Sequence, residues 1–365
     1  MTRDAEFLAR LRLARSEGVG PRTYMRLMAH FATAAEALAA MPAMSARGGR
    51  RRPLRPCPEG RAETELAALD ALGGRMIFAG DADYPEALGA IPDPPPALSV
   101  LGDASRLAGP AIGMVGMRNG SAVGRKFARG LAADLGAAGV VVVSGMARGI
   151  DGAAHEGSLA TGSVAVLAGG VDMPYPRENE ALYRRLVEQG AAVSDQPLGT
   201  APTARHFPPR NRIIAGLSLG VVVVEANLRS GSLITARLAN EQGRVVFAVP
   251  GSPLDPRAAG PNDLLRQGAV LVERADDVIA AVEGMARPAP APARKAPETA
   301  PAFPEEVDEG TRGAVVDRLA HTPLTVDELV RECQLSAASV QTVLLELELA
   351  GRVVRQPGNR VSLIT

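Results

Sequence analysis

Aromatic residues, cysteines and lysines are all scarce in this 365-residue chain. Its two cysteines, Cys57 and Cys333, lie too far apart in the sequence to indicate a disulfide framework or a zinc-ligand set. Only Lys126 and Lys295 are lysines, so almost all of the positive charge is carried by arginine. Any phosphate recognition therefore uses planar guanidinium groups rather than the compact charge of an ammonium group. We expect no bound metal.

The formal net charge is zero, and the sequence has no long apolar run. A neutral chain has no overall field that attracts nucleic acid or a membrane surface. No apolar run approaches the roughly 20 residues that a membrane-spanning helix needs. Residues 1–18 are charged throughout, unlike a signal peptide. We therefore expect a cytoplasmic protein without a membrane span, long enough for two or three domains.

The centre of the chain contains a run of four valines, Val140 to Val143, followed by a glycine-rich turn over residues 144–149. Consecutive apolar residues cannot alternate between two environments, so the run predicts a strand buried on both faces in a parallel sheet. Asp151 and the alanines after it favour a helix. A strand, a glycine turn and a helix start together place free backbone N–H groups where an anion binds well, although an ordinary turn fits this stretch equally.

Predicted strands alternate with predicted helices between residues 73 and 286. The apolar runs predict strands at 76–78, 97–101, 111–115, 140–144, 163–167, 191–194, 221–225, 245–249 and 269–272. Helical patterns between them cover residues 125–138, 178–188, 232–242 and 275–283. This alternation indicates a doubly wound, mostly parallel α/β sheet, on which ligands bind beyond the carboxyl ends of the strands.

The N-terminal region, residues 1–72, is expected to be helical. Its turn at Gly18–Pro21 resembles the hairpin of helix-hairpin-helix and SAM-like modules. Such a hairpin either contacts the DNA backbone through its amides or serves as a packing unit. The arginine-rich run 47–55 is interrupted by glycine and proline, so we expect a loop that is either a solvated linker or a secondary phosphate contact.

The C-terminal region begins with a proline- and alanine-rich linker over residues 287–305, followed by a predicted winged-helix domain at 306–365. Its helices are expected at 314–320, 325–333 and 336–350, and its hairpin pairs 353–356 with 360–363 across Pro357 to Asn359. The third helix of such domains often enters the major groove of DNA. Here it carries Glu346 and Glu348 and no lysine or arginine, so we expect a protein-contact or weak accessory module.

Two glycine-bearing turns contain further candidate ligand-binding residues. The turn at 113–118 is not a G-x-G-x-x-G sequence, and the next strand ends in Ser144-Gly145 rather than in an acidic ribose ligand, so no dinucleotide cofactor is expected. The segment 230–232 opens the helix after the strand at 221–225 and offers hydroxyls and amides to a phosphate. Alternatively, Ser230 is only the N-cap of that helix.

One aromatic residue, Phe207, lies beside three arginines in the segment 205–212, which we expect to be a proline-held loop leading into a helix. Single-stranded nucleic acid needs a ring to stack on a base and basic groups to contact phosphates. Alternatively, Phe207 anchors the core and Arg212 pairs with Glu225. The scarcity of aromatic residues favours the functional interpretation.

The sequence gives little support for catalysis. Asp151 and His155 share a helix face, but no serine, cysteine or metal-ligand set accompanies them at a recognisable spacing. We expect His155 to be a hydrogen-bonded structural residue, and Asp195 and Glu225 are the remaining candidate bases. The expected protein is not an enzyme.

Five motifs between residues 84 and 269 resemble the DprA/Smf family of DNA-processing proteins. They are SGMARGIDGAAHEG, AVLAGGVDMPYPREN, FPPRNRIIAGLS, VVEANLRSGSLITARLANEQGRVVFAVPG and GPNDLLRQGA. The resemblance implies an extended Rossmann domain that forms a homodimer, flanked by accessory SAM-like and winged-helix domains. It also implies a non-enzymatic protein that binds single-stranded DNA during natural transformation, protects it from nucleases, loads the RecA recombinase and relieves the block from single-strand-binding protein.

The same resemblance assigns phosphate contacts to Arg118 and to the glycine- and serine-bearing turns, and base stacking to Phe207. The DNA-binding residues that we expect are Arg118, Ser144, Gly145, Arg148, Arg205, Phe207, Arg210, Asn211, Arg212, Ser230, Gly231 and Ser232. The sequence departs from the family pattern at Met117, Asn119, Asp195 and Ala204. At the position of Ala204 the family often has a lysine, and we expect Arg205 to substitute for it.

Two other functions remain compatible with the sequence. One is a nucleotide-processing enzyme of the related lysine-decarboxylase-like Rossmann group, which needs a P-G-G-x-G-T turn with a nearby glutamate. Gly169 and Gly170 lack the glycine and threonine that should follow them. The other is an adaptor that bridges recombination proteins without binding DNA.

Overall fold

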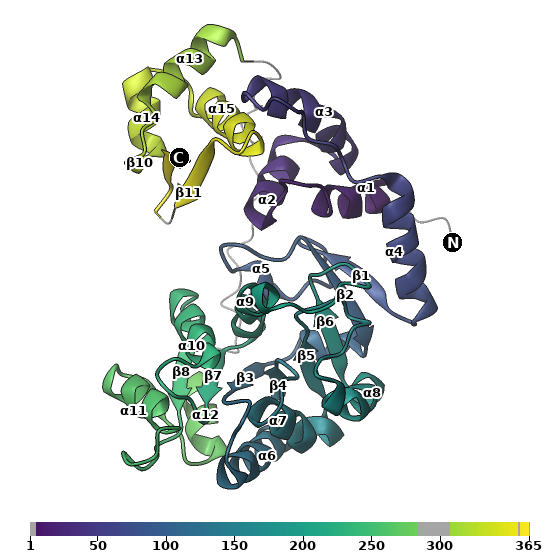
Figure 1. Ribbon diagram of the computed structural model, residues 1–365, viewed down its shortest axis with the longest axis vertical. Helices are drawn as coiled ribbons and strands as arrows, with labels where there is room; N and C mark the ends of the chain where they lie inside the picture. The colour runs from purple at the N-terminus through teal and green to yellow at the C-terminus, as the bar shows by residue number, and fades with distance from the viewer. Residues whose placement is uncertain (1–4, 284–306, 357, 365) are drawn as a thin grey trace. The chain divides into compact units, whose positions relative to one another are not determined.

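Figure 1 shows the computed structural model of the chain, which describes residues 5–283, 307–356 and 358–364. The chain divides into two compact units, a larger one that starts at residue 64 and a smaller one that combines the N-terminal residues up to 63 with the C-terminal region. The predicted linker at 287–305 and Pro357 of the predicted hairpin turn lie outside the described residues. Within the described ranges, no helix is long and apolar enough to cross a membrane.

The larger unit is built on a nine-stranded sheet with the order β1-β2-β6-β5-β4-β3-β7-β8-β9. Its strands are β1 Arg75–Phe78, β2 Ala97–Gly102, β3 Ala111–Val115, β4 Val141–Ser144, β5 Ser163–Val166, β6 Ala191–Ser194, β7 Gly220–Val223, β8 Val245–Ala248 and β9 Val270–Leu271. The seven neighbouring strands β6-β5-β4-β3-β7-β8-β9 pair in parallel, whereas β1 and β2 extend the sheet in antiparallel fashion. The predicted doubly wound, mostly parallel sheet is thus confirmed.

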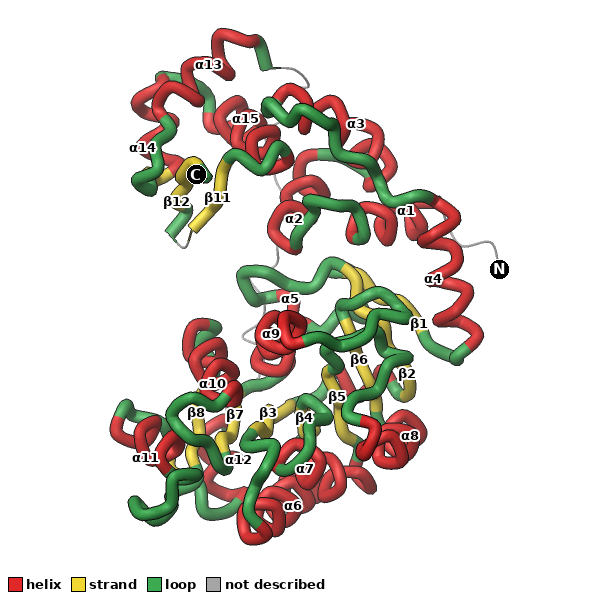
Figure 2. Tube along the Cα trace, in the orientation of Figure 1, coloured by secondary structure: helices red, strands yellow, loops and turns green. Residues whose placement is uncertain are grey.

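Helices cover both faces of this sheet (Figure 2). They are α5 Glu86–Gly89, α6 Ala122–Ala137, α7 Ile150–Ser158, α8 Glu180–Gln189, α9 Phe207–Leu217, α10 Gly231–Glu241, α11 Ala259–Arg266 and α12 Ala275–Val282, with short 3-10 turns η1 Ala104–Leu107, η2 Leu159–Thr161, η3 Arg177–Asn179 and η4 Ala204–His206. The chain runs from β3 outward through β4, β5 and β6, and then returns to the other side of β3 to form β7. The carboxyl ends of β3 and β7 therefore form a topological switch point, where ligands of such sheets bind.

The valine run explains why helices are needed on both faces. Val142 belongs to a core that α6 and α7 cover with Leu131 and Ile150. Val141 and Val143 belong to a second core, which α9 and α10 cover from the opposite face. Successive residues of a strand point to opposite faces, so β4 is fully buried only as an inner strand of a two-sided sheet.

The smaller unit joins the N-terminal helices to the C-terminal winged helix. The N-terminal helices are α1 Ala5–Ala14, α2 Pro21–His30, α3 Ala34–Arg47 and α4 Glu59–Ala71, which contains the boundary between the two units. The winged helix consists of α13 Glu309–Arg318, α14 Val326–Cys333, α15 Ala337–Leu349 and a sheet of β10 Leu324–Thr325, β12 Arg360–Leu363 and β11 Val353–Gln356. Both predicted folds are confirmed. Strand β10 was not predicted, because two residues are too short for a recognisable alternation.

Helix α15, the third helix of the winged helix, packs against the N-terminal helices. Val343 and Leu347 lie in the core of the winged helix. Leu345 and Leu349 instead lie in the core of the N-terminal helices, together with Leu27. Because both sides of α15 are buried against apolar residues, this helix is an internal element of the smaller unit.

Two glutamates of α15 form ion pairs with arginines of the N-terminal helices. Glu346 has a side chain that is 1% exposed, and it accepts hydrogen bonds from Arg47 Nε at 2.6 Å and Arg312 Nε at 2.9 Å. Glu348 pairs with Arg26. The prediction of a loop at Arg47 is wrong, since this residue ends α3 and the ion pair holds its last turn. The acidic residues of α15 thus stabilise a contact within the chain.

Candidate nucleic-acid interface

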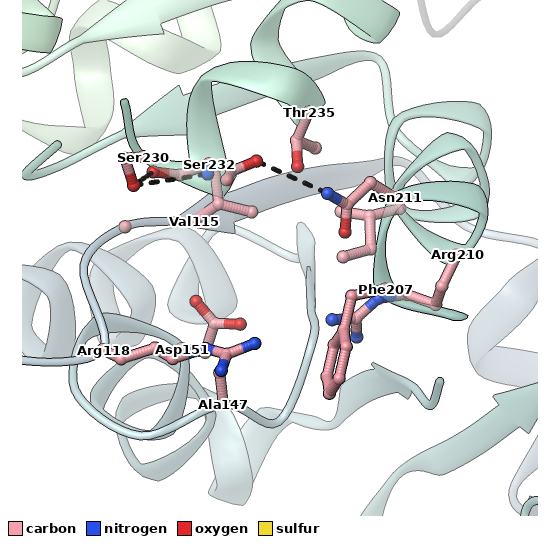
Figure 3. A pocket seen from close by; sticks show the side chains of 13 residues that line it. Val115, Arg118, Ala147, Asp151, Phe207, Arg210, Asn211, Ser230, Ser232 and Thr235 are labelled. Carbon is pink, nitrogen blue, oxygen red and sulfur yellow. Dashed lines mark hydrogen bonds between the residues drawn. The ribbon is translucent and has the colours of Figure 1, made fainter. Parts of the chain in front are cut away.

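A hollow of about 220 Å³ opens at the switch point between β3 and β7 (Figure 3). The end of β3, the turns after β3 and β4, the start of α7, helix α9 and the N-terminal half of α10 contribute its lining residues, which are Val115, Gly116, Arg118, Ala147, Asp151, Phe207, Arg210, Asn211, Ile214, Ser230, Gly231, Ser232 and Thr235. The fold therefore gathers seven of the predicted DNA-binding residues, which are Arg118, Phe207, Arg210, Asn211, Ser230, Gly231 and Ser232.

The turn between β4 and α7 is held by the carboxylate of Asp151. Its Oδ2 accepts a hydrogen bond from the Gly145 N–H at 3.2 Å, and the backbone N–H groups of Ala147 and Gly116 also donate to the carboxylate. The turn passes so close to the turn after β3 that only glycine fits at Gly149, where φ is +77° and a Cβ atom would lie 2.3 Å from the carbonyl oxygen of Met117. Burial raises the pKa of Asp151 above its ordinary value. Asp151 therefore fixes the turns after β3 and β4 relative to each other.

Arg210 lines the hollow with its charge buried. Its Nη1 donates hydrogen bonds to the carbonyl oxygen of Gly145 at 2.8 Å and to that of Val166. Its Nε has no hydrogen-bond partner among the described residues. Burial lowers the pKa of Arg210 to about 10, with Asp151 acting in the opposite direction, so the guanidinium stays charged at neutral pH. A buried cation in the wall of the hollow favours an anion that enters it.

The Phe207 ring lines the hollow and belongs to neither apolar core of the sheet. The Arg118 guanidinium lies over this ring with its Cζ 4.8 Å from the centroid, and the Arg210 Cζ lies 5.9 Å from it. The Tyr175 ring meets it edge to face, with 5.9 Å between the centroids and 60° between the planes. Helix α9 begins at Phe207, so the prediction of a loop over 205–212 is wrong for most of this segment. The first helical turn accepts its two prolines because the N–H groups there need no helical partner.

The N-terminus of α10 forms another wall of the hollow, next to Asn211 of α9 (Figure 3). Ser230 is the N-cap, since its Oγ accepts a hydrogen bond from the Ser232 N–H at 3.4 Å, and the two hydroxyl oxygens lie 2.6 Å apart. The first turn of α10 contains no acidic residue. The positive end of the helix dipole therefore faces the hollow without a compensating carboxylate of its own.

Four other predicted residues do not line the hollow. Ser144 is buried, and its hydroxyl donates to a carbonyl oxygen of β3 at 2.6 Å. Gly145 takes part only through its backbone, which bonds to Asp151 and Arg210. Arg148 is exposed and lies 3.5 Å from a carboxylate of η3, and Arg205 is exposed in the turn before α9.

Arg212 is committed to a different contact. Its Nη2 donates to Asp195 at 3.0 Å, and the two side chains are 10% and 14% exposed. The alternative pairing with Glu225 is wrong, because Glu225 accepts hydrogen bonds from the N–H of Ser121 at 2.8 Å and from its hydroxyl at 2.5 Å, at the start of α6. Residues two apart on a helix point in different directions, so Arg210 and Arg212 cannot both reach the hollow.

His155 is a structural residue, as predicted. Its ring is fully buried, and Nδ1 lies 2.9 Å from the hydroxyl of Ser163. Burial lowers the pKa of His155 to about 3, so the imidazole is neutral. Within the described ranges, no group of three or more His, Cys, Asp or Glu side chains is placed to hold a metal ion.

Asp151 and Tyr175 are not among the site residues predicted from the sequence. For Asp151 a signal was present, because a carboxylate directly after a glycine turn often accepts bonds from the N–H groups of that turn. Tyr175 lies in the segment between β5 and α8. No local pattern connects it to Phe207, and only the packing of the folded chain brings the two rings together.

A doubly wound sheet whose switch point carries a helix N-terminus, a buried arginine and an aromatic ring is typical of Rossmann-type proteins that bind phosphate groups. Comparison with known proteins narrows this class. Residues 75–283 match the family model of DNA recombination-mediator protein A, residues 4–68 match the DprA-like N-terminal HHH domain, and residues 288–359 match the DprA winged helix domain. The chain belongs to the DprA/Smf family, as its motifs predicted.

Individual relatives agree with this assignment. Protein Smf of Escherichia coli strain K12 is 39% identical over 310 residues, which cover 84% of this chain and 82% of that protein. The DNA processing protein DprA of Bacillus subtilis is 46% identical over 216 residues, covering 58% and 73%. The X-ray structure of DNA processing protein A from Streptococcus pneumoniae is similar with a TM-score of 0.62 and 32% identity, covering 77% of this chain and 98% of that one. A structure of DNA processing protein A from Helicobacter pylori, described for its single-stranded DNA binding mode, has a TM-score of 0.53 and 27% identity, covering 58% and 98%.

Proposed function

We propose that this chain binds single-stranded DNA at the hollow and acts as a recombination mediator in the cytoplasm. In this proposal it protects DNA that enters during natural transformation, loads the RecA recombinase and relieves the block from single-strand-binding protein, as a homodimer formed through the Rossmann domain. Membership of the DprA/Smf family supports the proposal, as does the binding mode described for the Helicobacter pylori relative. The observation that carries it is the placement of the Phe207 ring beside Arg118 and Arg210 at the switch point.

The geometry suits an unpaired strand better than a duplex. The exposed guanidinium of Arg118 and the N-terminus of α10 offer donors for backbone phosphates, and the buried charge of Arg210 favours an anion beside them. The Phe207 ring offers a surface on which a base stacks. Bases in a duplex are already paired and stacked on their neighbours, so a side-chain ring reaches them only after they are displaced.

We also propose that the chain is not an enzyme. Asp151 is the one carboxylate among the described lining residues, and it is buried and accepts hydrogen bonds from three backbone N–H groups. Glu225 is engaged at the start of α6, and Asp195 is paired with Arg212. None of these three carboxylates is free to take a proton from a substrate in the hollow.

The proposal is tested by measuring oligonucleotide binding and nucleotide turnover side by side. Fluorescence anisotropy with single- and double-stranded oligonucleotides of the same sequence should show tighter binding of the single strand. The logarithm of affinity should fall with the logarithm of salt concentration by about 0.7 for each phosphate neutralised. Equal affinity for duplex, or no dependence on salt, contradicts the proposal.

The enzyme alternative is examined in the same experiment. Incubation with nucleoside monophosphates, NAD or ATP should release no product above background. A turnover that Glu225→Gln abolishes would support the nucleotide-processing enzyme instead. Absence of both DNA binding and turnover would favour an adaptor that contacts only proteins.

A further inference from the structure

Tyr175 is an exposed aromatic residue beside the proposed DNA-binding hollow. Its side chain is 46% exposed, whereas the other tyrosines of the chain, Tyr24, Tyr84 and Tyr183, are 1%, 7% and 7% exposed. A tyrosine that is not needed for the core leaves its ring in water at a cost, and such rings are common where a flat ligand binds. The position of Tyr175 next to Phe207 suggests which ligand that is.

The segment that carries Tyr175 is fixed at both ends by hydrogen bonds. Before it, the Asp172 carboxylate accepts from the Gly199 N–H at 2.9 Å. After it, Asn179 Nδ2 donates to the carbonyl oxygens of Met146 and Ala147 at 2.8 and 3.0 Å, in the turn that forms part of the hollow. Tyr175 is therefore presented in a set position beside the hollow, and little conformational entropy is lost when a ligand contacts it.

The side chains of Arg118 and Tyr175 both contact the Phe207 ring. The Arg118 guanidinium lies over the Phe207 ring at 4.8 Å, and the Tyr175 ring makes an edge-to-face contact with it. Tyr175 is more exposed than Phe207 and has a ring surface open to solvent. A base that approaches this pair of rings therefore has two stacking surfaces available, and the surface of Tyr175 is the more accessible one.

We propose that Tyr175 is a second stacking surface, which binds a nucleotide adjacent in the strand to the one at Phe207. This proposal rests on the proposed binding of single-stranded DNA. The planes of the two rings are inclined by 60°, so bases stacked on both of them are inclined by a similar angle. Neighbouring bases in a duplex are nearly parallel, and only an unpaired strand can adopt such a splayed arrangement. The angle between the rings thus selects for single strands.

The test uses the absence of tryptophan from the chain, which makes tyrosine its main intrinsic fluorophore. Since the other three tyrosines are buried, a base that stacks on Tyr175 should quench a distinct part of the emission when oligothymidylate is added to the full-length protein. Tyr175→Phe keeps the ring but removes this fluorophore, so the quenching should be lost while anisotropy still reports binding. Tyr175→Ala removes the ring, and the affinity for oligothymidylate should fall about 5- to 150-fold.

Two further variants separate stacking from other effects. Tyr175→Leu fills a similar volume without an aromatic face, and it should bind as weakly as Tyr175→Ala. Leu254→Ala changes an apolar side chain that is 92% exposed and does not line the hollow, and it should leave binding and quenching unaltered. Tyr175→Ala should also lose more affinity for single strands than for duplex, because the inclined pair of rings is broken.

The outcomes distinguish this inference from the proposed function. If anisotropy shows tight single-strand binding but tyrosine emission does not change, and Tyr175→Ala binds like the unaltered protein, the role of Tyr175 is overturned while the proposed function stands. If the unaltered protein does not bind oligothymidylate, the proposed function fails. Binding by Tyr175→Leu at the strength of Tyr175→Phe would show that bulk, and not stacking, is what the position provides, which also overturns the inference.

Discussion

Arg210 Nη1 donates a hydrogen bond to the carbonyl oxygen of Gly145 at 2.8 Å, which joins α9 to the turn after β4. Phe207 precedes Arg210 by one helical turn, so this bond also determines where the Phe207 ring lies. Hydrogen bonds to the backbone of the sheet edge thus set the positions of the ring and of the charged groups in the site. Its parts are expected to respond differently to substitution.

Phe207→Ala and Arg118→Ala should separate stacking from charge. Loss of the ring should weaken single-strand binding by about 1–3 kcal/mol with little change in the salt slope. Loss of Arg118 should weaken binding and also reduce the salt slope by about 0.7, because one phosphate contact is removed. Salt titrations monitored by anisotropy measure both quantities.

The same variants need a measurement of thermal unfolding. Phe207 lies outside both apolar cores of the sheet. Phe207→Ala should therefore lower the free energy of unfolding by less than a core phenylalanine does, for which the loss is about 3–5 kcal/mol. A larger loss of stability would place the ring in the core and remove the stacking assignment.

Gly145→Ala should destabilise the protein, whereas Gly231→Ala should not. A Cβ atom at Gly145 would lie 2.4 Å from Arg210 Nη1, while a Cβ atom at Gly231 meets nothing within 4 Å. Displacing the buried guanidinium should cost about 1–3 kcal/mol of unfolding free energy. Urea unfolding of the two variants provides the comparison, and equal midpoints would mean that the Arg210 contact is unimportant for stability.

His155 should make stability depend on pH below neutrality. The folded-state pKa of His155 is about 3 and its ordinary value is 6.5, so the unfolded chain binds more protons between these values. Stability therefore falls as the pH is lowered through 6.5, by about 2 kcal/mol between pH 7 and pH 5. Urea unfolding of the protein and of His155→Gln at both pH values isolates this contribution, and the variant should show a smaller difference. Equal differences would contradict a buried neutral imidazole.

Glu346→Gln should destabilise the smaller unit. The substitution leaves Arg47 and Arg312 without their shared carboxylate, and we expect a loss of about 2–4 kcal/mol, somewhat below the value for a fully buried pair because Arg47 is 34% exposed. Glu332→Gln is the control, since Glu332 and Arg318 form an exposed pair at 3.5 Å, and it should cost less than about 1 kcal/mol. Hydrogen exchange in α3 and α15 measures the local effect. Similar exchange in both variants would contradict the buried pair.

Deletion of residues 310–365 should leave most of the single-strand affinity intact, because the hollow belongs to the larger unit. The deletion also removes Leu345 and Leu349 from the core of the N-terminal helices. We therefore expect these helices to become sensitive to proteolysis while oligonucleotide binding persists. A collapse of affinity in a truncated protein whose Rossmann unit remains folded would assign DNA binding to the winged helix.

Apolar runs were sufficient to predict the strands of the large sheet. A strand such as β4, buried on both faces, has an uninterrupted run of valines that no exposed element would tolerate. The motif around Phe207 likewise identified one wall of the hollow, because a single helical turn carries both that ring and Arg210. Local sequence was informative wherever the feature to be predicted lies within a single strand or a single helical turn.

Features that depend on contacts between distant segments were not predictable in the same way. Arg212 lies two residues from Arg210, but the start of α9 at Phe207 turns it towards Asp195. The pairing of Arg47 with Glu346 spans 299 residues, and Tyr175 reaches Phe207 only across the sheet edge. The periodicity of a sequence shows which face of one helix or strand is buried. These residue pairs depend instead on how several helices and strands pack together.

The shared core of the N-terminal helices and α15 has a consequence for the modular exchange of these domains. In a chimaera of two relatives, a winged helix placed on foreign N-terminal helices would bring Leu345, Leu349 and Glu346 to a surface that has not been matched to them. The two ends of this chain therefore have to be transplanted together, although the whole Rossmann domain separates them in the sequence. A breakpoint chosen from sequence order alone would cut through a single folding unit.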